Sequence, residues 1–404
     1  MSDNLADPSL PERPLLRLLP GHDRRLRAGH PWVFSNELAW SPGLRALPAG
    51  GLVRLESASG RAFGTFMFNP HSLIAARRLS PDPEAVIDSR FLAARLTAAS
   101  CLRARFFASP WYRLCHAEAD GLPGLVIDRY GGVFVVSAGA AGAARLEAEL
   151  LDALDDLFAP LAVVARDEGP ARALEGLPER AAILAGRLPQ RLELEEGGVI
   201  FPIDVLKGQK TGWFYDQRFN RDTVAALAAG ARVLDLYCHT GAFGLRCAVG
   251  GAARVVLADR SEPALAIAAE TARGNGLAER VEILRAEAFG LLERLAAEGG
   301  RFDLVIADPP AFAKSRKDHG PALKGYEKLA RLAAAVVAPG GFLFIASCSH
   351  HVSAEEFALC VARGLAKAGR EGRILRSAGA GPDHPVHPHL PESAYLKSLL
   401  LQLD

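Results

Sequence analysis

The sequence lacks a long apolar run, an excess of one charge and any close pair of cysteines. No apolar stretch without charge, Pro or Gly is long enough to span a bilayer, so we expect no membrane partner. Lys and Arg number 47 against 46 Asp and Glu, which argues against a strongly basic protein that binds nucleic acid over its whole surface. A local basic patch that binds nucleic acid is still compatible with this balance. The six cysteines form no C-x-x-C pair, so we expect neither a metal site nor a disulfide framework.

What is present predicts a multidomain globular enzyme. With 404 residues, 50% of them hydrophobic, the chain can form two or three domains with large cores. Residues 1–12 are acidic and contain Pro, without the basic-then-apolar order of a signal peptide, so we expect a cytoplasmic location. Changes in composition and in the pattern of apolar residues predict a small β-rich domain over 1–85, a central α+β domain over 86–190 and an α/β domain over 191–404.

The first zone combines short β-like runs with basic and aromatic residues. Runs 52–56 and 61–68 flank a Ser/Ala/Gly turn and predict a hairpin. Arg24, Arg25 and Arg27 precede Trp32, a mixture that suits a phosphate backbone and a stacked base. A solvated, charged strand edge beside a small core is an equally good interpretation.

The two later zones differ in their order of elements. The central zone predicts a helix over 91–107, a hairpin over 124–137, a helix over 143–158 and a strand over 161–165. Beyond residue 209, apolar strands alternate with helices rich in Ala, Leu, Glu and Arg; the strands are expected at 233–236, 254–258, 303–307 and 342–346. This pattern favours a parallel sheet covered on both faces, with ligands at the carboxyl ends of the strands.

Acidic residues at the first strand ends suit a nucleoside with an ammonium group. The first turn has Asp235 and Gly241 but no G-x-G-x-x-G, so a dinucleotide fits poorly and the amino-acid end of S-adenosylmethionine fits better. Asp259 ends the next strand, where a carboxylate can accept hydrogen bonds from ribose hydroxyls. Glu287 could take the adenine amino group, although a plain surface glutamate is the stronger alternative. A simple βα turn is the alternative for Asp235.

Two later strand ends carry reactive groups. Asp308 is followed by Pro309 and Pro310, which hold the loop extended and fix the carboxylate over the sheet edge. Cys348 follows the next strand between hydroxyl and imidazole groups, where a nucleophile would stand. An inert packing cysteine is an equal alternative.

These residues belong to a wider set of motifs in which the chain resembles a known family. The motifs cover nearly the whole length and include 29–34, 69–72, 112–114, 118–125, 208–212, 216–218, 235–241, 308–312, 347–350, 383–385 and 395–397. In this order they resemble the bacterial 23S rRNA cytosine-5 methyltransferases of the RlmI type. The resemblance implies an RNA-binding PUA domain, a central α+β domain and a Rossmann-like, seven-stranded class I methyltransferase domain.

The resemblance also implies roles for individual residues. The methionine end of S-adenosylmethionine would be lined by Asp235, Tyr237, Thr240 and Gly241. Asp259 would hold the ribose and Glu287 would lie at the adenine edge, although many family members have Asp there. The segment 208–218 would close over the same pocket through Gln209, Lys210, Thr211 and Phe214.

Methylation of carbon 5 of cytosine would require a nucleophile such as the Cys348 thiol. Carbon 5 of cytosine is a weak nucleophile, so we hypothesise that the Cys348 thiolate adds to carbon 6 and activates carbon 5. Asp308 would hold the ring, and Asp308, a neighbouring histidine or water would remove the carbon-5 proton. The alternatives are methylation of a guanine ring nitrogen or an exocyclic amino group, and a non-catalytic RNA-binding or assembly factor. A homodimer is left open.

Overall fold

The computed structural model describes residues 13–313 and 315–404, so the acidic segment 1–12 lies outside the described residues. The chain forms two compact units. The N-terminal unit contains residues 1–190, 205–213 and 385–391, and the C-terminal unit contains 191–204, 214–384 and 392–404. No helix among the described residues is long and apolar enough to cross a membrane.

The N-terminal unit begins with a five-stranded sheet in the order β1-β3-β4-β5-β2. Its strands are β1 (Leu15–Arg17), β2 (Trp32–Phe34), β3 (Gly51–Glu56), β4 (Ala62–Phe68) and β5 (Ile74–Ser80). The short helices α1 (Arg24–Arg27), η1 (Ser35–Glu37) and α2 (Pro42–Arg45) lie between strands. The antiparallel pairing of β3 with β4 confirms the predicted hairpin, and its alternating apolar residues bury Val53, Leu55 and Phe66 in a small core.

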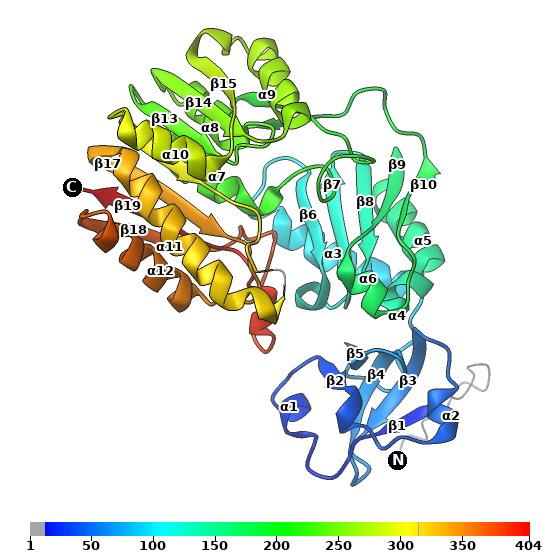
Figure 1. Cartoon of the computed structure of the whole chain (residues 1–404). Coiled ribbons are helices and arrows are strands. Elements are labelled where there is room, and N and C mark those ends of the chain that lie inside the picture. Colours follow the sequence, from blue (N-terminus) through cyan, green and yellow to red (C-terminus); the bar gives the residue numbers. More distant parts are fainter. Residues whose placement is uncertain (1–12, 314) are drawn as a thin grey trace. The chain divides into compact units, whose positions relative to one another are not determined.

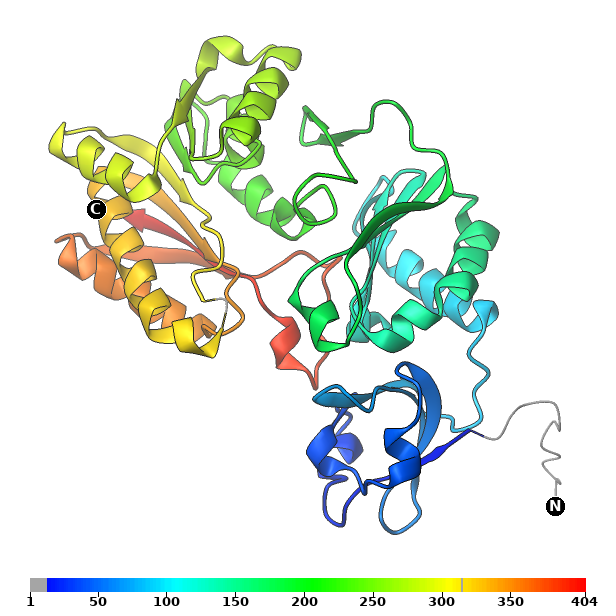
Figure 2. The ribbon, with the colours of Figure 1, turned by 45° about the vertical axis from the view of Figure 1, so that its right-hand side comes forward.

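A second five-stranded sheet follows, in the order β10-β9-β8-β7-β6. Its strands are β6 (Trp111–His116), β7 (Leu125–Tyr130), β8 (Val133–Ala138), β9 (Ala162–Asp167) and β10 (Arg180–Gly186). The helices are α3 (Ser89–Arg103), α4 (Ala141–Arg145), α5 (Glu147–Phe158) and α6 (Pro170–Leu174), with η2 (Ala117–Asp120) after β6. Helices α3 and α5 pack together on one face of this sheet (Figure 2).

The β7–β8 hairpin was predicted correctly, whereas three other details differ. Strands β6 and β10 were not predicted, because β6 follows directly on the expected helix end and β10 is an Ala-rich edge strand with little apolar alternation. The helix expected over 143–158 is two helices divided at Leu146. Helix α3 ends at Arg103 rather than at 107.

A buried carboxylate joins the two sheets of the N-terminal unit. Glu175, just beyond α6, is 5% exposed. It accepts hydrogen bonds from Asn69 Nδ2 and Ser72 Oγ of the first sheet, both at 2.8 Å, and from the Ala141 backbone N–H at 3.2 Å. Arg77 contacts it at 3.1 Å and also contacts Glu118 at 3.3 Å. The first sheet is therefore held against the second by a hydrogen-bonded charge rather than by apolar contact alone.

The C-terminal unit contains a seven-stranded sheet in the order β15-β14-β13-β16-β17-β19-β18 (Figure 1). Its strands are β13 (Arg232–Leu236), β14 (Arg254–Asp259), β15 (Val281–Arg285), β16 (Phe302–Ala307), β17 (Val337–Ser347), β18 (Gly372–Ala378) and β19 (Lys397–Leu403). The first five are parallel, and β19 runs antiparallel to both β17 and β18. A two-stranded hairpin, β11 (Glu193–Glu196) with β12 (Val199–Pro202), precedes the sheet.

Helices cover both faces of this sheet. Those on one face are α7 (Arg218–Ala225), α8 (Ala242–Val249) and α9 (Glu262–Gly274), and those on the other are α10 (Ala288–Ala297), α11 (His319–Val336) and α12 (Ala354–Lys367). Single turns lie at η3 (Tyr215–Gln217), η4 (Ala278–Arg280), η5 (Arg316–Asp318) and η6 (Pro391–Ser393). The apolar strands share one large core with α10, α11 and α12, and the parallel sheet between two helical layers confirms the predicted α/β architecture.

Candidate active site

The carboxyl ends of the five parallel strands bring the residues singled out by sequence to one edge of the sheet. Strand β13 carries Asp235 and ends at Leu236, and β14 ends at Asp259. Glu287, Asp308 and Cys348 follow β15, β16 and β17. Parallel strands place these ends side by side, so this edge of the C-terminal unit is the candidate site.

The turn between β13 and α8 has an unusual backbone. Gly241 has φ +83°, and a Cβ there would lie 2.9 Å from Leu257 Cδ1, so glycine is required at this position. Tyr237 and His239 also have positive φ values, of 57° and 51°. The backbone N–H of Gly244 donates to Asp235 Oδ2 at 2.9 Å, which ties the start of α8 to the strand. Such a strained, tight turn is typical of a ligand-binding loop.

Asp259 and Phe214 support this turn from two sides. Asp259 Oδ2 accepts the His239 backbone N–H at 3.0 Å, and its Oδ1 accepts that of Ser261 at 2.8 Å. The Phe214 ring meets the His239 ring edge to face, with centroids 5.7 Å apart. Phe214 thus lies at the turn, and its predicted contact with the cofactor stays a prediction.

Tyr237 and Glu287 lie close enough to influence one another. Burial raises the pKa of the Tyr237 hydroxyl, and the Glu287 carboxylate raises it further. Glu287 also caps α10, because its Oε2 accepts the Gly290 backbone N–H at 3.0 Å. A capping glutamate has a structural function of its own, and its proposed contact with adenine remains a prediction.

The electrostatics of the site suit a cationic ligand. Burial, helped by the neighbouring Asp308 and Asp259 carboxylates and opposed by the Gly244 hydrogen bond, raises the pKa of Asp235 to about 8. An ammonium or sulfonium ion placed there would relieve the repulsion among the three acids. S-adenosylmethionine carries both cations at its methionine end, so the residues present fit this cofactor.

Asp308 is oriented by a chain of side-chain amides. Gln217 Nε2 donates to Asp308 Oδ2 at 2.8 Å, and Asn220 Nδ2 donates to Gln217 Oε1 at 2.7 Å. Gln217 and Asn220 are both buried. Because the second amide fixes the first, the carboxylate is held in one orientation over the sheet edge.

A buried network of hydroxyl groups surrounds Cys348. Ser347 Oγ donates to the Tyr326 hydroxyl at 2.8 Å, and Tyr326 pairs with Ser349 Oγ at 2.8 Å. Ser349 Oγ also accepts the Ala313 backbone N–H at 3.2 Å. The loop that begins at Asp308 and the turn that carries Cys348 are therefore connected through Ser349.

The cysteines differ in their environment. Cys115, Cys238, Cys247 and Cys360 are buried, and Cys101 is exposed on α3 of the N-terminal unit. Burial raises the pKa of Cys238 well above its ordinary value, which makes this thiol next to the cofactor turn a poor nucleophile. Cys348 is partly exposed at the sheet edge. Its position therefore suits reaction better than that of the four buried thiols.

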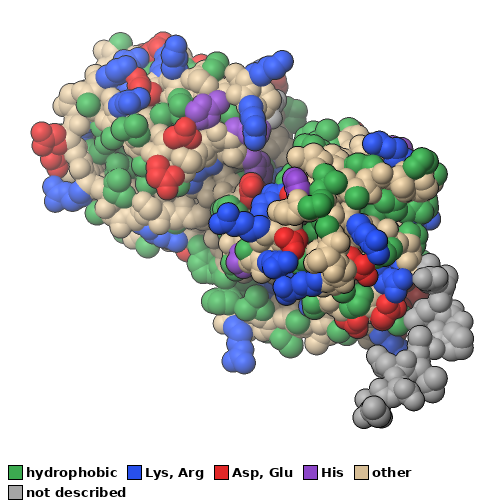
Figure 3. Space-filling model, turned by 90° about the horizontal axis from the view of Figure 1, so that it is seen from below, with side chains coloured by type: hydrophobic (Ala, Val, Ile, Leu, Met, Phe, Trp, Pro, Cys, Tyr) green, Lys and Arg blue, Asp and Glu red, His purple; other side chains and the backbone are tan. Residues whose placement is uncertain are grey.

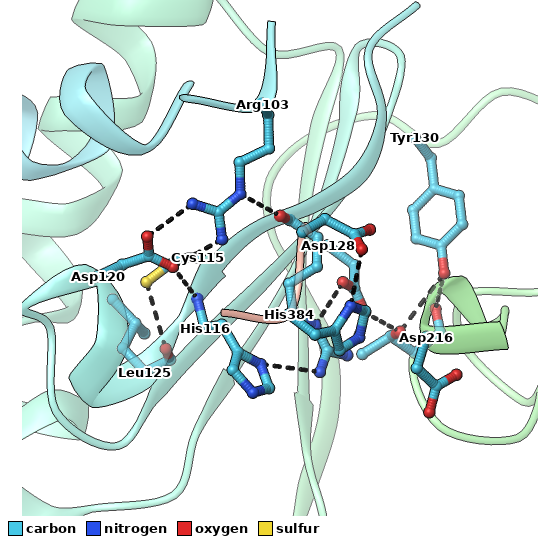
Figure 4. A network of polar contacts seen from close by, with 12 residues as sticks. Arg103, Cys115, His116, Asp120, Leu125, Asp128, Tyr130, Asp216 and His384 are labelled. Carbon is cyan, nitrogen blue, oxygen red and sulfur yellow. Dashed lines mark hydrogen bonds and ion pairs between the residues drawn. The ribbon is translucent and has the colours of Figure 1, made fainter. Parts of the chain in front are cut away.

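The predicted residues Gln209, Lys210 and Thr211 belong to the N-terminal unit. The Thr211 hydroxyl donates to Asp128 Oδ2, and the Tyr130 hydroxyl donates to the Thr211 carbonyl at 3.2 Å (Figure 4). A bidentate pair with Arg113, with both contacts at 2.8 Å, holds Asp128 in place. These contacts anchor the segment to β7, and its proposed contact with the cofactor stays a prediction.

The residues predicted to bind RNA lie in the first sheet and its helix α1. Arg24, Arg25 and Arg27 are all exposed. Arg25 pairs with Glu37 at 2.7 Å, and Arg27 pairs with Asp23 at 2.6 Å. Trp32 Nε1 donates to Glu118 at 2.8 Å, which ties the indole to the central sheet. On the face drawn in Figure 3, Lys and Arg are interspersed with Asp and Glu.

Sequence reasoning missed three residues that hold parts of the site in place. Gln217 lies inside the 216–218 motif, but no pattern indicated its contact with Asp308. Tyr326 is a single tyrosine in an Ala-rich helix and gave no signal. Lys397 lies inside the 395–397 motif without an assigned role. Among the described residues, no group of three or more His, Cys, Asp or Glu is arranged to hold a metal ion.

Comparisons with known proteins agree with this architecture. A family model described as S-adenosylmethionine-dependent methyltransferase matches residues 177–402, and a PUA-like domain model matches 16–81. Two solved methyltransferases share the fold: one named SMU.776, in complex with SAH (20% identity, 97% of this chain and 100% of the other, TM-score 0.82), and one from Streptococcus mutans (21% identity, 96% and 100%, TM-score 0.81).

Two relatives are named ribosomal RNA large subunit methyltransferase I. The protein from Photobacterium profundum is 36% identical over 385 residues, covering 94% of this chain and 97% of its own length. The protein from Shewanella denitrificans is 36% identical over 393 residues, covering 96% and 99%. The chain therefore belongs to the S-adenosylmethionine-dependent methyltransferases, in the family of ribosomal RNA large subunit methyltransferase I.

Proposed function

We propose that this protein transfers a methyl group from S-adenosylmethionine to carbon 5 of a cytosine in large-subunit (23S) rRNA. The names of its full-length relatives support large-subunit rRNA as the substrate. The observation that carries the choice of atom is Cys348, a partly exposed thiol at the carboxyl end of β17 whose turn is connected to the Asp308 loop. A thiol is the group that carbon-5 chemistry needs and ring-nitrogen chemistry does not.

The cofactor supplies an electrophilic methyl group on a sulfonium sulfur. Asp235, Tyr237, Thr240 and Gly241 would bind its methionine end, Asp259 its ribose and Glu287 its adenine edge. Phe214 would line the pocket, and Gln209, Lys210 and Thr211 would lie over it. Asp235 ionises when the cationic ligand binds, because the ligand offsets the cost of its buried charge.

Cys348 and Asp308 would act on the base. The Cys348 thiolate would form a bond to carbon 6, and the electron pair would move to carbon 5. Carbon 5 would then take the methyl group as the bond from methyl to the sulfonium sulfur breaks, with that electron pair left on sulfur as a neutral thioether. A base then removes the carbon-5 proton, the bond from sulfur to carbon 6 breaks and the thiolate is restored. Asp308, oriented by Gln217, would hold the cytosine ring during both steps. The base must leave its stack to reach this edge, which an RNA loop allows.

Phe312 bears on the amino-group alternative. An enzyme of that class often uses an aromatic ring after the two prolines to stack its base. Here Ala311 intervenes, and the Phe312 ring stacks on Tyr326 with centroids 4.6 Å apart. A ring packed in this way is occupied within the protein, which favours carbon 5 over an amino group.

RNA binding would start at the PUA-like domain. We propose that Arg24, Arg25 and Arg27 contact the phosphate backbone and that Trp32 lies beside a base. We also propose that the protein acts in the cytoplasm, with a homodimer as one assembly to test by its solution mass.

The test is methyl transfer from labelled S-adenosylmethionine to unmodified rRNA, followed by digestion to nucleosides. We expect label in 5-methylcytidine with the wild type and none with Cys348→Ala. Cys101→Ala is the matched control, because it removes an exposed thiol of the N-terminal unit. Label on another base, or transfer that survives Cys348→Ala, would reject the covalent route. Absence of cofactor binding would instead support the non-catalytic alternative.

A further inference from the structure

Lys397 is a buried lysine beside the Cys348 turn. It begins β19 and lies opposite Ser347 in the antiparallel pairing of β17 with β19. The residue is 8% exposed, and its Nζ donates to the carbonyl oxygens of Ser349 at 2.5 Å and Val352 at 2.6 Å. The ammonium group therefore bridges the start and the end of the turn that carries Cys348.

Burying an ammonium group costs free energy, because the charge loses its contact with water. The groups around it therefore indicate its function. Two carbonyl dipoles satisfy two of its three donors. Burial lowers the pKa of Lys397, while Cys348 and then Glu356 raise it again. Cys348 is thus the acid that most favours the charged form of Lys397. Lys397 binds the carbonyl oxygen of the residue that follows Cys348, so its positive charge lies close to this thiol and favours the thiolate form.

The other charged or titratable groups around the turn do not replace Lys397. The Glu356 carboxylate accepts the backbone N–H of Ser353, the N-cap of α12, at 2.9 Å and pairs with His319 at 2.9 Å, with its side chain 41% exposed. Burial lowers the pKa of His350, and the Lys397 charge lowers it further, so this imidazole stays neutral while its ring stacks on Tyr395. Burial raises the pKa of the Tyr326 hydroxyl, which also stays neutral. His351, the other imidazole of the turn, is exposed. Lys397 is therefore a buried cation that β19 places beside the Cys348 turn.

We propose that Lys397 is a positioning residue that fixes the 348–352 turn and stabilises Cys348 as a thiolate before it adds to the pyrimidine. The thiol proton passes to solvent, and Lys397 keeps its own proton throughout. The addition step rests on the proposed function, whereas the stabilised thiolate is a property of the unliganded protein and can be measured without RNA.

The first measurement uses the unmodified full chain. Carbamidomethylation of Cys348 by iodoacetamide is followed against pH, and the peptide that contains Cys348 is quantified by mass spectrometry, which separates it from the exposed Cys101. We expect the rate to reach half of its maximum below the ordinary cysteine pKa of about 8.5. A midpoint at or above this value would overturn the proposal without any variant.

The second measurement compares two substitutions that remove one positive charge each. Lys397→Met keeps the length of the side chain, and we expect the Cys348 midpoint to rise by about one pH unit, so that alkylation at pH 7 slows about tenfold. Lys367→Met is the control, because Lys367 is 62% exposed on α12, and it should leave the midpoint unchanged. If Lys397→Met does not fold, Lys397→Arg, which keeps the charge, should retain the wild-type midpoint. An unchanged midpoint in folded Lys397→Met refutes the proposal.

Methyl transfer separates this inference from the proposed function. One outcome is that methyl transfer requires Cys348 while the pH midpoint of Cys348 alkylation does not change in Lys397→Met. In that case the covalent route stands and the role of Lys397 is rejected. If the Cys348 midpoint depends on Lys397 but Cys348→Ala still methylates rRNA, the covalent route fails and the stabilised thiolate stands.

Discussion

Tyr326→Phe removes one hydroxyl group from the centre of the network around Cys348. The ring would remain in place, because it stacks on Phe312 and meets Phe357 edge to face with centroids 5.2 Å apart. The hydrogen bonds to Ser347 and Ser349, each of 2.8 Å, are lost, together with the contact to the Phe312 backbone. The substitution therefore tests the polar network separately from the packing of the core.

The expected loss follows from these two hydrogen bonds. Tyr326 is fully buried, so water cannot replace the missing hydroxyl. Each neutral hydrogen bond contributes about 1 kcal/mol net, and both serines keep one other partner, so we expect a loss of about 2 kcal/mol. For a domain of this size that corresponds to a fall in Tm of about 4–8 °C. We also expect kcat to fall while the affinity for S-adenosylmethionine is retained, because the hydroxyl holds the two serines on either side of Cys348.

Thermal unfolding and single-turnover methyl transfer measure the two effects. Ser347→Ala and the double variant complete a cycle, in which the coupling of Tyr326 and Ser347 should be about 1 kcal/mol. A Tyr326→Phe protein with the Tm and kcat of the wild type would show that the network neither stabilises the fold nor positions the thiol.

Two further predictions concern buried acids. Asp235→Asn should weaken S-adenosylmethionine binding, measured by calorimetry, yet stabilise the unliganded protein. The pKa of Asp235 in the folded protein is raised to about 8, so the wild type loses stability as the pH rises from about 4 to about 8. The loss is up to about 1.4 kcal/mol per pH unit, and the Asn variant should not show it. An equal pH dependence of Tm in both proteins would contradict this. Glu175→Ala should destabilise the N-terminal unit by about 3 kcal/mol, because it leaves Asn69, Ser72 and Arg77 without this carboxylate. Burial opposes ionisation of Glu175, but the Asn69 hydrogen bond and the Arg77 charge lower its pKa overall. The difference in free energy of urea unfolding between wild type and variant should therefore disappear as the pH falls through that lowered pKa. A difference that persists in acid would refute the stabilising role of the Glu175 carboxylate.

The sequence was most informative where local pattern and topology coincide. Continuous apolar strands between helices predict a parallel sheet, and a parallel sheet places Asp259, Asp308 and Cys348 at one edge. The Gly at position 241 could be identified because a glycine in the turn after the first strand lets the backbone approach a ligand closely, and the structure adds that its φ is positive. In each case the reasoning needed only the residue and its place relative to a strand.

Sequence reasoning failed where the function of a residue depends on a distant partner. Gln217 meets Asp308 across 91 positions, and Lys397 meets the carbonyl of Ser349 across 48. Neither contact has a local period, and both require the sheet order, in which β19 lies beside β17. Strand β10 was missed for a related reason, because an Ala-rich edge strand is specified by its pairing with β9 more than by its own side chains.

The two proposed catalytic groups are held by one connected structure. Gln217 fixes Asp308 at the start of its loop, and the Ala313 backbone N–H fixes the other end of that loop to Ser349. Ser349 is also held by Tyr326, and its carbonyl oxygen accepts from Lys397. A shift of the Cys348 turn would thus displace the Asp308 loop as well, because buried hydrogen bonds resist being broken singly. The spacing of thiol and carboxylate is consequently set before any base enters, as expected of a site that must hold a pyrimidine ring between an attacking sulfur and a methyl donor.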